Sequence, residues 1–275
     1  MHKLILLLLS VATATLMFTS CSKKNDDVKP VAKNYVLVHG AWQAPYVWDA
    51  VKVSLINEGN NVTVVELPGH GSDQTVPSTL TLTSYRDKVI NAMSGINGKV
   101  ILVGHSLGGM IISAVAEQNP SKIEKLVYLA AYLPSSGQSL LSLAGTDAGS
   151  ALGDSVNHVA ILSQNANGTL DVLHDQITNV FIQDGSAQVQ TLVLQNYRPE
   201  PAIPFTNPVT LTAANFGSVE KVYIKTLQDR VVSPGLQDRM IASGNVKTVY
   251  QLNTSHSAFL AKPDSVALLL TRTGQ

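Results

Sequence analysis

The sequence predicts an α/β fold: a mostly parallel sheet of about six strands, flanked by helices, with a helical cap inserted into it. Short runs of β-branched and aliphatic residues, typical of strands covered on both faces, alternate with amphipathic runs of helical length. This alternation stops near residue 134 and resumes near residue 216. A content of 45% hydrophobic and 14% charged residues in 275 suits one globular domain rather than a disordered or fibrous chain.

The individual elements follow from these runs, in chain order. Aliphatic and β-branched segments such as YVLV and VILV predict strands, and segments with an apolar face every three to four residues predict helices. Strands are expected at 35–38, 62–66, 100–103, 126–130, 222–225 and 248–252. Helices are expected at about 47–57, 84–93, 110–118, 236–243 and 265–271.

The insertion at about 134–216 is rich in Ser, Gly, Asn and Gln, with weaker helical runs at 170–183 and 187–195. A segment of this length with few aromatic residues would form only a thin core alone. We therefore expect a cap over the sheet, inside a single domain at 34–275, rather than a second domain.

The N-terminal segment predicts export. After Lys3, an apolar run to about residue 18 is too short and too interrupted by Ser and Thr for a spanning helix, so a signal peptide is expected at 1–20. Its end at Cys21 resembles the lipobox of bacterial lipoproteins, which implies acylation of Cys21 and anchoring in the cell envelope, on the periplasmic or surface side. An ordinary secretory signal with an incidental cysteine is the alternative. The polar stretch to residue 33 is expected to be a flexible linker.

Charge and cysteine content exclude several classes of partner. Lys plus Arg and Asp plus Glu both number 19, so no net charge attracts nucleic acid, and membrane contact is expected only through the N-terminal anchor. Cys21 has no second cysteine for an internal disulfide and no clustered histidines for a zinc site. We expect neither a metal nor a cofactor.

The stretch KVILVGHSLGGMIISAVAEQNP, residues 99–120, predicts a nucleophile. Gly104, Ser106 and Gly108 match GxSxG, a weak motif alone, but here it lies between an aliphatic strand and an amphipathic helix, as in the nucleophile elbow of α/β-hydrolases. A sharp turn that strains the serine backbone leaves no room for side chains two residues away, which accounts for both glycines. The alternative is a glycine-rich turn with a buried structural serine.

A serine nucleophile needs a base, and the base needs an acid that orients it. In this fold the chain order is nucleophile, acid, histidine. Asp229 follows the strand at 222–225, and His256 lies between the last strand and the last helix, so both are expected at the carboxyl edge of the sheet. Asp238 and Asp264, on or beside predicted helices, are the competing acids and better suit solvated surface positions.

The remaining histidines are expected to have structural roles. His105 is expected to pack under the elbow, and His39 to hydrogen-bond locally and shape the glycine turn after it. Four others are expected on the surface or in turns: His2 in the signal, His158 and His174 in the insertion, and His70 in a GHG turn.

An oxyanion hole is expected from two backbone amides, that of Leu107 after the nucleophile and that of Ala41 after the first strand. Gly40 lets the backbone turn its amides toward a reacting carbonyl, where two donors contribute several kcal/mol in a dry site. The aromatic residues that follow either line a pocket or pack in the core: Trp42, Tyr46 and Trp48.

These stretches resemble the α/β-hydrolase branch that contains the plant methylesterases, such as those acting on methyl salicylate and methyl jasmonate, and the hydroxynitrile lyases. The resemblance spans about 35–270 and rests on VLVHGAW, VILVGHSLGGM, FGSVEKVYIKTLQD and the loop with His256. In the insertion it is confined to NYRPEP, so it implies no pocket residues there. It implies a triad and two oxyanion donors at the positions already named: Ser106, Asp229 and His256, with Ala41 and Leu107.

Three positions distinguish this chain from the lyases that it resembles. Those lyases have threonine at the position of Gly40, an acid at that of His105 and lysine at that of Ser257. Lyase chemistry needs a cation near the leaving cyanide, and Ser257 supplies none. The sequence therefore predicts a cofactor-free serine hydrolase that cleaves carboxylic esters through an acyl-enzyme. The alternatives are a hydroxynitrile lyase, lactonase, thioesterase or C–C hydrolase on the same scaffold, or a non-catalytic binding lipoprotein.

Overall fold

The structure is a computed structural model that describes residues 31–153 and 161–275. The predicted signal peptide, Cys21 and the linker up to residue 30 lie outside the described residues, as do His2 and His158.

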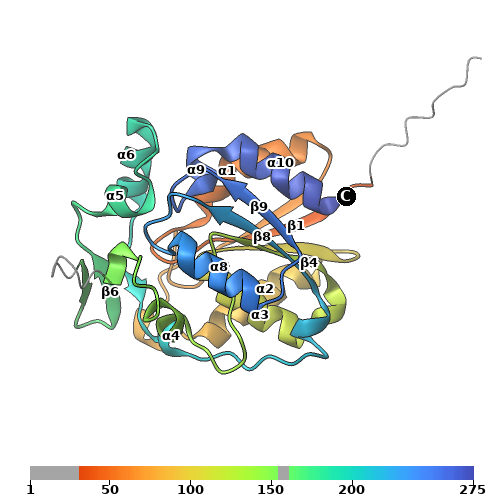
Figure 1. Cartoon of the computed structure of the whole chain (residues 1–275), viewed down its shortest axis with the longest axis horizontal. Helices are drawn as coiled ribbons and strands as arrows, with labels where there is room; N and C mark the ends of the chain where they lie inside the picture. Colours follow the sequence, from red (N-terminus) through yellow and green to blue (C-terminus); the bar gives the residue numbers. More distant parts are fainter. Residues whose placement is uncertain (1–30, 154–160) are drawn as a thin grey trace, which may run out of the picture. The chain divides into compact units, whose positions relative to one another are not determined.

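Six strands form one sheet in the order β2-β1-β3-β4-β8-β9, and each neighbouring pair is parallel (Figure 1). The central strand β3 is buried at every residue, because helices cover both faces of the sheet, and its first four residues are the aliphatic type that suits such a position. All six predicted strands are present, with ends shifted by up to a few residues: β1 (Asn34–Val38), β2 (Asn61–Val65), β3 (Val100–His105), β4 (Ile123–Leu129), β8 (Glu220–Thr226) and β9 (Thr248–Leu252).

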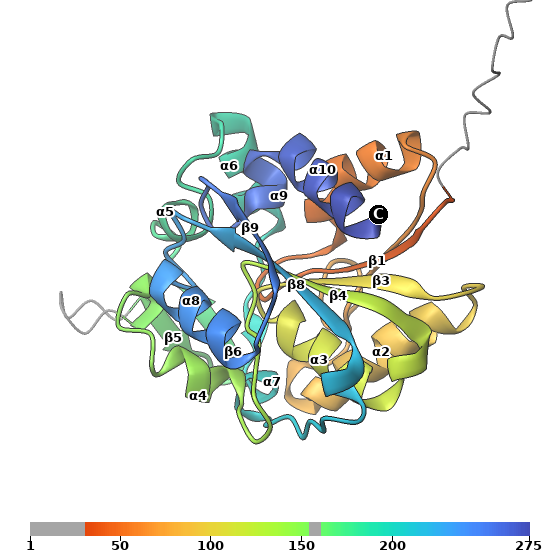
Figure 2. The same ribbon diagram turned by 45° about the vertical axis from the view of Figure 1, so that its right-hand side comes forward.

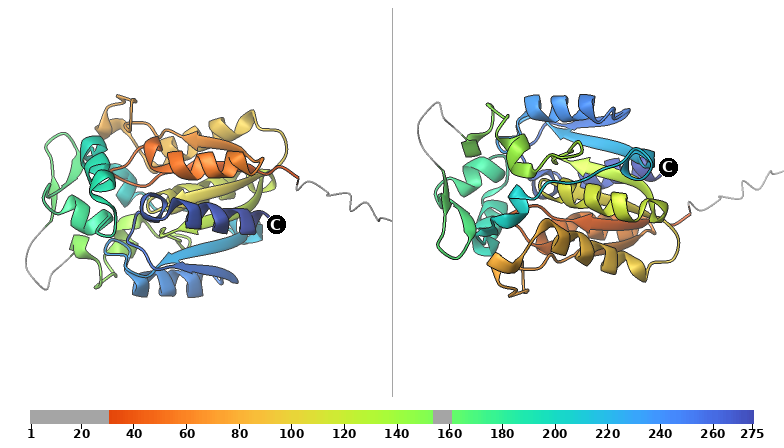
Figure 3. Two further views of the ribbon diagram at one scale, coloured as in Figure 1. Left: turned by 90° about the horizontal axis from the view of Figure 1, so that it is seen from above. Right: turned by 90° about the horizontal axis from the view of Figure 1, so that it is seen from below.

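Helices cover the sheet in two layers (Figures 2 and 3). One layer holds α1 (Asp49–Asn57), α9 (Ala258–Ala261) and α10 (Pro263–Gly274), and the other holds α2 (Leu82–Ser94), α3 (Gly108–Gln118) and α8 (Pro234–Ser243). The five long helices agree with the predicted ones, and the short α9 was not predicted. None of the helices within the described ranges combines the length and apolar character needed to span a bilayer.

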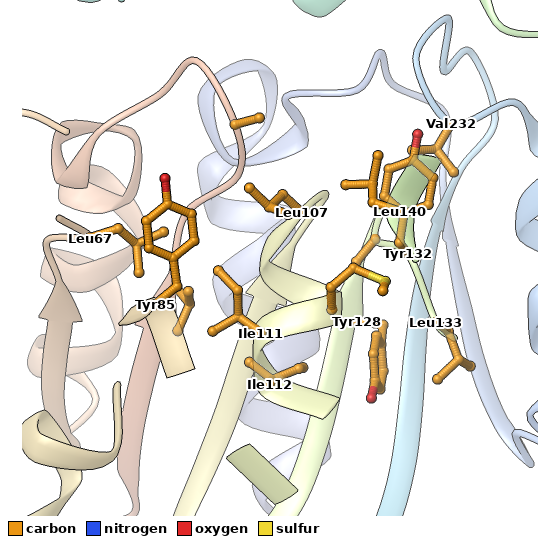
Figure 4. Close-up of a cluster of buried hydrophobic side chains, with 14 of the residues drawn as sticks. Leu67, Tyr85, Leu107, Ile111, Ile112, Tyr128, Tyr132, Leu133, Leu140 and Val232 are labelled. Atoms are coloured by element: carbon orange, nitrogen blue, oxygen red, sulfur yellow. The ribbon is translucent and has the colours of Figure 1, made fainter. Parts of the chain in front are cut away.

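Each helical layer buries its own hydrophobic cluster against the sheet. On the α2 and α3 side, Tyr85, Ile111 and Ile112 belong to one buried cluster with Tyr128 of β4 (Figure 4). On the other side, the ring of Trp48 packs at a tilt against that of Phe259, with ring centroids 4.8 Å apart. Short 3₁₀ turns connect several elements: Pro45–Trp48, Pro77–Thr79, Pro120–Lys122, Ala151–Gly153 and Phe216–Ser218.

The insertion lies beyond the carboxyl ends of the sheet strands (Figures 2 and 3). It was predicted to be helical, but it also contains a three-stranded antiparallel sheet, β5-β6-β7. The predicted helix at 170–183 is wrong in its first half, because Leu170 pairs with Gln164 and with Glu200 and this tertiary pairing overrides local propensity. The elements are α4 (Leu140–Ala144), β5 (Leu162–Gln164), β6 (Thr169–Val172), α5 (Ile177–Phe181), α6 (Ala187–Asn196), β7 (Glu200–Pro201) and α7 (Ile203–Thr206).

Candidate active site

Ser106 occupies a strained turn between β3 and α3. Its φ of 53° is in the left-handed region, which costs a residue with a side chain about 1–2 kcal/mol. The backbone around it holds this conformation: the Ser106 carbonyl accepts hydrogen bonds from the amides of Tyr132 at 3.1 Å and Gly109 at 3.0 Å. A Cβ at Gly104 would lie 2.6 Å from the carbonyl oxygen of Gly108, so the turn requires glycine there. The elbow thus has the geometry that the motif predicts.

Asp229 and His256 meet at the same edge of the sheet. Nδ1 of His256 lies 2.9 Å from Oδ2 of Asp229, and both residues are almost fully buried. A carboxylate only accepts hydrogen bonds, so Nδ1 carries the proton and Nε2, on the opposite edge of the ring, is the free acceptor. This is the tautomer that a general base for a serine hydroxyl needs.

The Asp229 carboxylate is fixed by more than the histidine. Its Oδ1 accepts the backbone amides of Val231 at 2.8 Å and Val232 at 2.9 Å. Its Oδ2 accepts the hydroxyl of Thr226 at 2.8 Å, and Gln237 Nε2 lies at 3.4 Å. Because hydrogen bonds compensate the loss of water, the buried charge is supported in one orientation.

His256 packs against His105, the residue before Ser106 in the elbow. The two imidazole centroids are 4.5 Å apart, and His105 Nε2 donates to the carbonyl oxygen of His256 at 3.0 Å. In the part of the chain that the structure describes, the Ser106 hydroxyl makes no hydrogen bond. Contacts of this kind are often long in an enzyme without its substrate, so the serine-to-histidine step stays a prediction.

Two buried backbone amides beside Ser106 have no acceptor among residues 31–153 and 161–275. They belong to Ala41 and Leu107, which are 4% and 0% exposed. A buried amide without a partner is rare, because it loses its hydrogen bond to water without replacement. Two such donors next to a strained serine match the requirement for stabilising an oxyanion, although their catalytic role stays a prediction.

Gly40 makes the approach of this loop to the elbow possible. A Cβ on it would lie 2.7 Å from Cβ of Ser106 and 2.8 Å from Nδ1 of His105. No real Cβ tolerates such distances, so any larger residue at position 40 must displace the loop or the elbow.

A cavity of about 250 Å³ opens onto Ser106. Its walls are nearly all apolar, and the residues that line it include no charged side chain. Trp42 lines this cavity, whereas Trp48 packs in the core. The sequence left both roles open for each of these residues. Most of the lining comes from the cap: Leu140, Leu141, Ala144, Gly145, Ser150, Leu152, Gly153, Leu162, Leu170 and Phe205.

His39 and His105 have the structural roles expected of them. His39 Nδ1 donates to the Gly40 carbonyl at 2.9 Å, and burial, together with nearby His70, lowers the pKa of His39 to about 3. Burial and the adjacent His256 hold the pKa of His105 well below its ordinary value. Both imidazoles are therefore neutral at neutral pH.

His70 lies in a turn, as predicted, but it is not on the surface. His70 is 2% exposed, and its Nε2 donates to Glu200 Oε2 at 2.7 Å. Burial alone would lower the pKa of His70, but the Glu200 carboxylate outweighs it and raises the pKa above its ordinary value. The hydrogen bond from His70 compensates the buried Glu200 carboxylate for its lost water, which favours an inward position of the GHG turn.

No role for Glu200 was predicted from the sequence. Glutamate is almost never fully buried unless it is paired, and nothing in the sequence identified a partner for it. The available signal was NYRPEP, which contains Glu200 and was the one stretch of the insertion that resembled the related enzymes.

The competing acids are in the solvated positions expected for them. Asp238 is 63% exposed and pairs with Lys225, and Asp264 is exposed in the first turn of α10. Within the described ranges, no three histidine, cysteine or acidic side chains come together as metal ligands would.

Comparison with known proteins places this geometry in context. The family model described as "Alpha/beta hydrolase family" matches residues 35–267. The chain is 31% identical to "Putative methylesterase 11, chloroplastic" of Arabidopsis thaliana over 90% of its own length. It spans 65% of the length of that relative. It is also 28% identical to the alpha-hydroxynitrile lyase of the same plant, over 86% of this chain and 97% of the lyase.

Solved structures share the fold. The crystal structure of polyneuridine aldehyde esterase matches with a TM-score of 0.78 at 22% identity, covering 89% of this chain and all of that one. A pyrethroid hydrolase matches with a TM-score of 0.74 at 23% identity, covering 88% of this chain and 97% of that one.

Proposed function

Since the chain belongs to the alpha/beta hydrolase family, we propose that it hydrolyses carboxylic esters through an acyl-enzyme formed on Ser106. The observation that carries this proposal is the pair of free, buried amides of Ala41 and Leu107 beside the strained serine. A binding protein that merely retained the fold would have no reason to keep two donors unpaired in its interior.

The proposed reaction uses each group where the fold places it. Nε2 of His256 takes the proton of the Ser106 hydroxyl as the oxygen attacks the ester carbonyl, and the carbonyl oxygen, now negative, accepts the amides of Ala41 and Leu107. Asp229 holds the imidazole through Nδ1 and stabilises its charge. His256 then gives the proton to the departing alkoxide, and water, deprotonated by the same imidazole, releases the acid.

The cavity favours an uncharged ester with an apolar acyl or alcohol group. Its walls carry no charged side chain that could bind a carboxylate or an ammonium group of the substrate. The relatives named methylesterases support an ester substrate. Lyase chemistry is disfavoured because Ser257 is buried, accepts a hydrogen bond from Gln43 at 3.1 Å and supplies no cation for cyanide.

The test uses a fluorophosphonate, which reacts with an activated serine, and a panel of methyl and aryl esters. We expect mass spectrometry to find the label on Ser106, and product analysis to find acid and alcohol in equal amounts. A folded protein that is not labelled at Ser106 and turns over none of the esters would refute the proposal. Aldehyde and cyanide from a cyanohydrin, with no ester turnover, would assign it to the lyases instead.

We also propose that the protein is an exported lipoprotein of the bacterial cell envelope, anchored through Cys21. Support comes from the apolar segment that ends at this cysteine and from the polar linker after it. Mass spectrometry of the mature N-terminus tests this directly: cleavage before Cys21 and a mass increase from acyl chains are expected. An unmodified Cys21 would rule out the anchor.

A further inference from the structure

Glu200 connects the cap to the loop that holds the Ala41 amide. Its Oε2 accepts the backbone amide of Trp42 at 2.8 Å and Nε2 of His70 at 2.7 Å. Its Oε1 accepts the hydroxyl of Tyr85 at 3.3 Å. Glu200 is fully buried, so these three donors replace the water that the carboxylate has lost.

Trp42 is held at both of its ends by facing residues of the cap. Leu170 and Glu200 are paired across β6 and β7, and while Glu200 accepts the Trp42 amide, the Leu170 carbonyl accepts the indole Nε1 at 3.0 Å. The indole ring also packs near Phe181 and Phe205, with centroids 5.5 and 5.6 Å away. Trp42 needs this support because its φ of 58° is in the left-handed region, which a residue with a side chain rarely adopts.

This arrangement decides which amide of the turn is free. Ala41 and Trp42 contribute consecutive amides, and Glu200 occupies the second of them. The Ala41 amide is left without an acceptor in the described part of the chain, beside Ser106. The hydrogen bond from the Trp42 amide to Glu200 holds the peptide group between Ala41 and Trp42 in place. It therefore also sets the orientation of Ala41 and of its free amide.

A carboxylate so near the oxyanion site would oppose the negative charge of the tetrahedral intermediate unless it were neutralised. His70 provides the compensating charge. Its Nδ1 faces the Pro68 carbonyl at 3.0 Å and its Nε2 faces Glu200, and because both partners only accept, both nitrogens carry protons. The pair therefore supplies a strong acceptor for Trp42 without a net charge beside the reacting oxygen.

We propose that Glu200 is a positioning residue for ester hydrolysis: through the Trp42 amide it orients the Ala41 donor toward the reacting carbonyl oxygen, and His70 neutralises its charge. This inference rests on the proposed function. It assigns the cap a role in building the oxyanion hole in addition to lining the cavity.

The kinetic test measures kcat and KM for a short nitrophenyl ester. Glu200→Ala removes the acceptor and is expected to lower kcat about 10²–10³-fold, as for loss of one oxyanion donor, with KM within about 3-fold. Glu200→Gln keeps an oxygen that can accept the Trp42 amide, and it is expected to stay within about 10-fold of wild type. Kcat for Glu200→Ala within about 3-fold of wild type, or a rise in KM alone, would overturn the proposal.

The matched control is Glu117→Ala. Glu117 also ties a loop to the fold, accepting the amides of Thr212 at 2.7 Å and Phe216 at 3.3 Å, but at the far end of α3 from Ser106. It is expected to lower thermal stability and leave kcat unchanged. Amide hydrogen exchange at Trp42 should be at least about 10-fold faster in Glu200→Ala and unchanged in Glu117→Ala. Equal effects of the two variants on kcat would reduce Glu200 to a stabilising contact.

A second pair of variants decides the matter if Glu200→Ala does not fold. His70→Gln leaves the carboxylate uncompensated and is expected to lower kcat at least about 10-fold, and adding Glu200→Gln should restore kcat to the level of Glu200→Gln alone. A double variant no more active than His70→Gln would overturn the proposal. If wild type hydrolyses no ester, the proposed function fails and this inference fails with it. If wild type is active and both Glu200→Ala and His70→Gln are unimpaired, only this inference fails.

Discussion

Nδ1 of His256 lies 2.9 Å from Oδ2 of Asp229, although 27 positions separate the two residues in the chain. The contact forms because β8 and β9 are parallel neighbours, so the loops that follow them leave the sheet at the same edge. Two backbone amides on the other carboxylate oxygen keep Asp229 from turning away.

Asp229→Asn is expected to lower kcat about 10⁴-fold while the protein stays folded. The asparagine oxygen can still accept the amides of Val231 and Val232, but its NH₂ group would face Nδ1 and hold His256 in the wrong tautomer. Ester kinetics with a thermal melt measure this. The control is Asp238→Asn, since Asp238 is exposed, and equal losses in both variants would contradict the assignment.

Gly40→Ala is expected to destabilise the fold by about 1–3 kcal/mol and to lower kcat at least about 10-fold. The added Cβ would lie 2.7 Å from Cβ of Ser106, so either the loop or the nucleophile must shift. Urea denaturation and ester kinetics test both effects. In the control Gly95→Ala the added Cβ meets no atom within 4 Å, and a change below about 0.5 kcal/mol is expected. Gly40→Ala that matched this control would show that the contact is not tight.

The pH dependence of the free energy of unfolding should show that His39 is buried and neutral in the folded protein. The unfolded chain binds a proton at His39 near pH 6.5, whereas burial lowers the pKa of the folded residue to about 3, so the unfolded state binds more protons between these values. Stability therefore falls as pH decreases below about 6.5, by up to about 1.4 kcal/mol per pH unit for this residue. Buried His105, whose pKa burial also lowers, adds to the same slope.

Urea denaturation between pH 7 and 5 measures this slope. His39→Asn should reduce this slope by up to about 1.4 kcal/mol per pH unit, the contribution of one proton. His174→Asn, at an exposed position, should leave the slope unchanged. His70 acts in the opposite sense: Glu200 raises its pKa, so its contribution is present below about pH 6.5 and is lost as pH rises through the folded value. Equal slopes in wild type and His39→Asn would contradict the buried, neutral His39.

Ala144→Phe should shorten the acyl group that the cavity accepts. Ala144 lines the cavity of about 250 Å³, so a ring there takes up space that a long acyl chain needs. We expect kcat/KM for a long-chain nitrophenyl ester to fall roughly 10-fold or more, with a much smaller effect on the acetyl ester. Ala50→Phe, on the exposed side of α1, is the control. A uniform loss for both esters would place the acyl group elsewhere.

The sheet and the elbow could be predicted because their causes are local. The first four residues of β3 are aliphatic, and the glycines around Ser106 are required by the turn itself. The positions of Asp229 and His256 followed from chain order and from parallel strands, which bring distant loops to one edge.

The cap could not be predicted in the same way, because its structure depends on contacts across the fold. The run after residue 170 was predicted to be helical, but its first residues pair with other cap strands. Glu200 gave no sign of its role, since its three partners come from three different segments. Pairing of this kind is visible only when the distant segments are placed together.

The most direct test of the account is the hydrolysis of a short nitrophenyl ester by Ser106→Ala. The removed oxygen faces a cavity and makes no hydrogen bond in the described part of the chain, so the variant should fold like wild type. We predict that kcat falls by a factor on the order of 10⁴ or more with an unchanged melting temperature. Undiminished hydrolysis by the folded Ser106→Ala protein would contradict the nucleophile and the mechanism built on it.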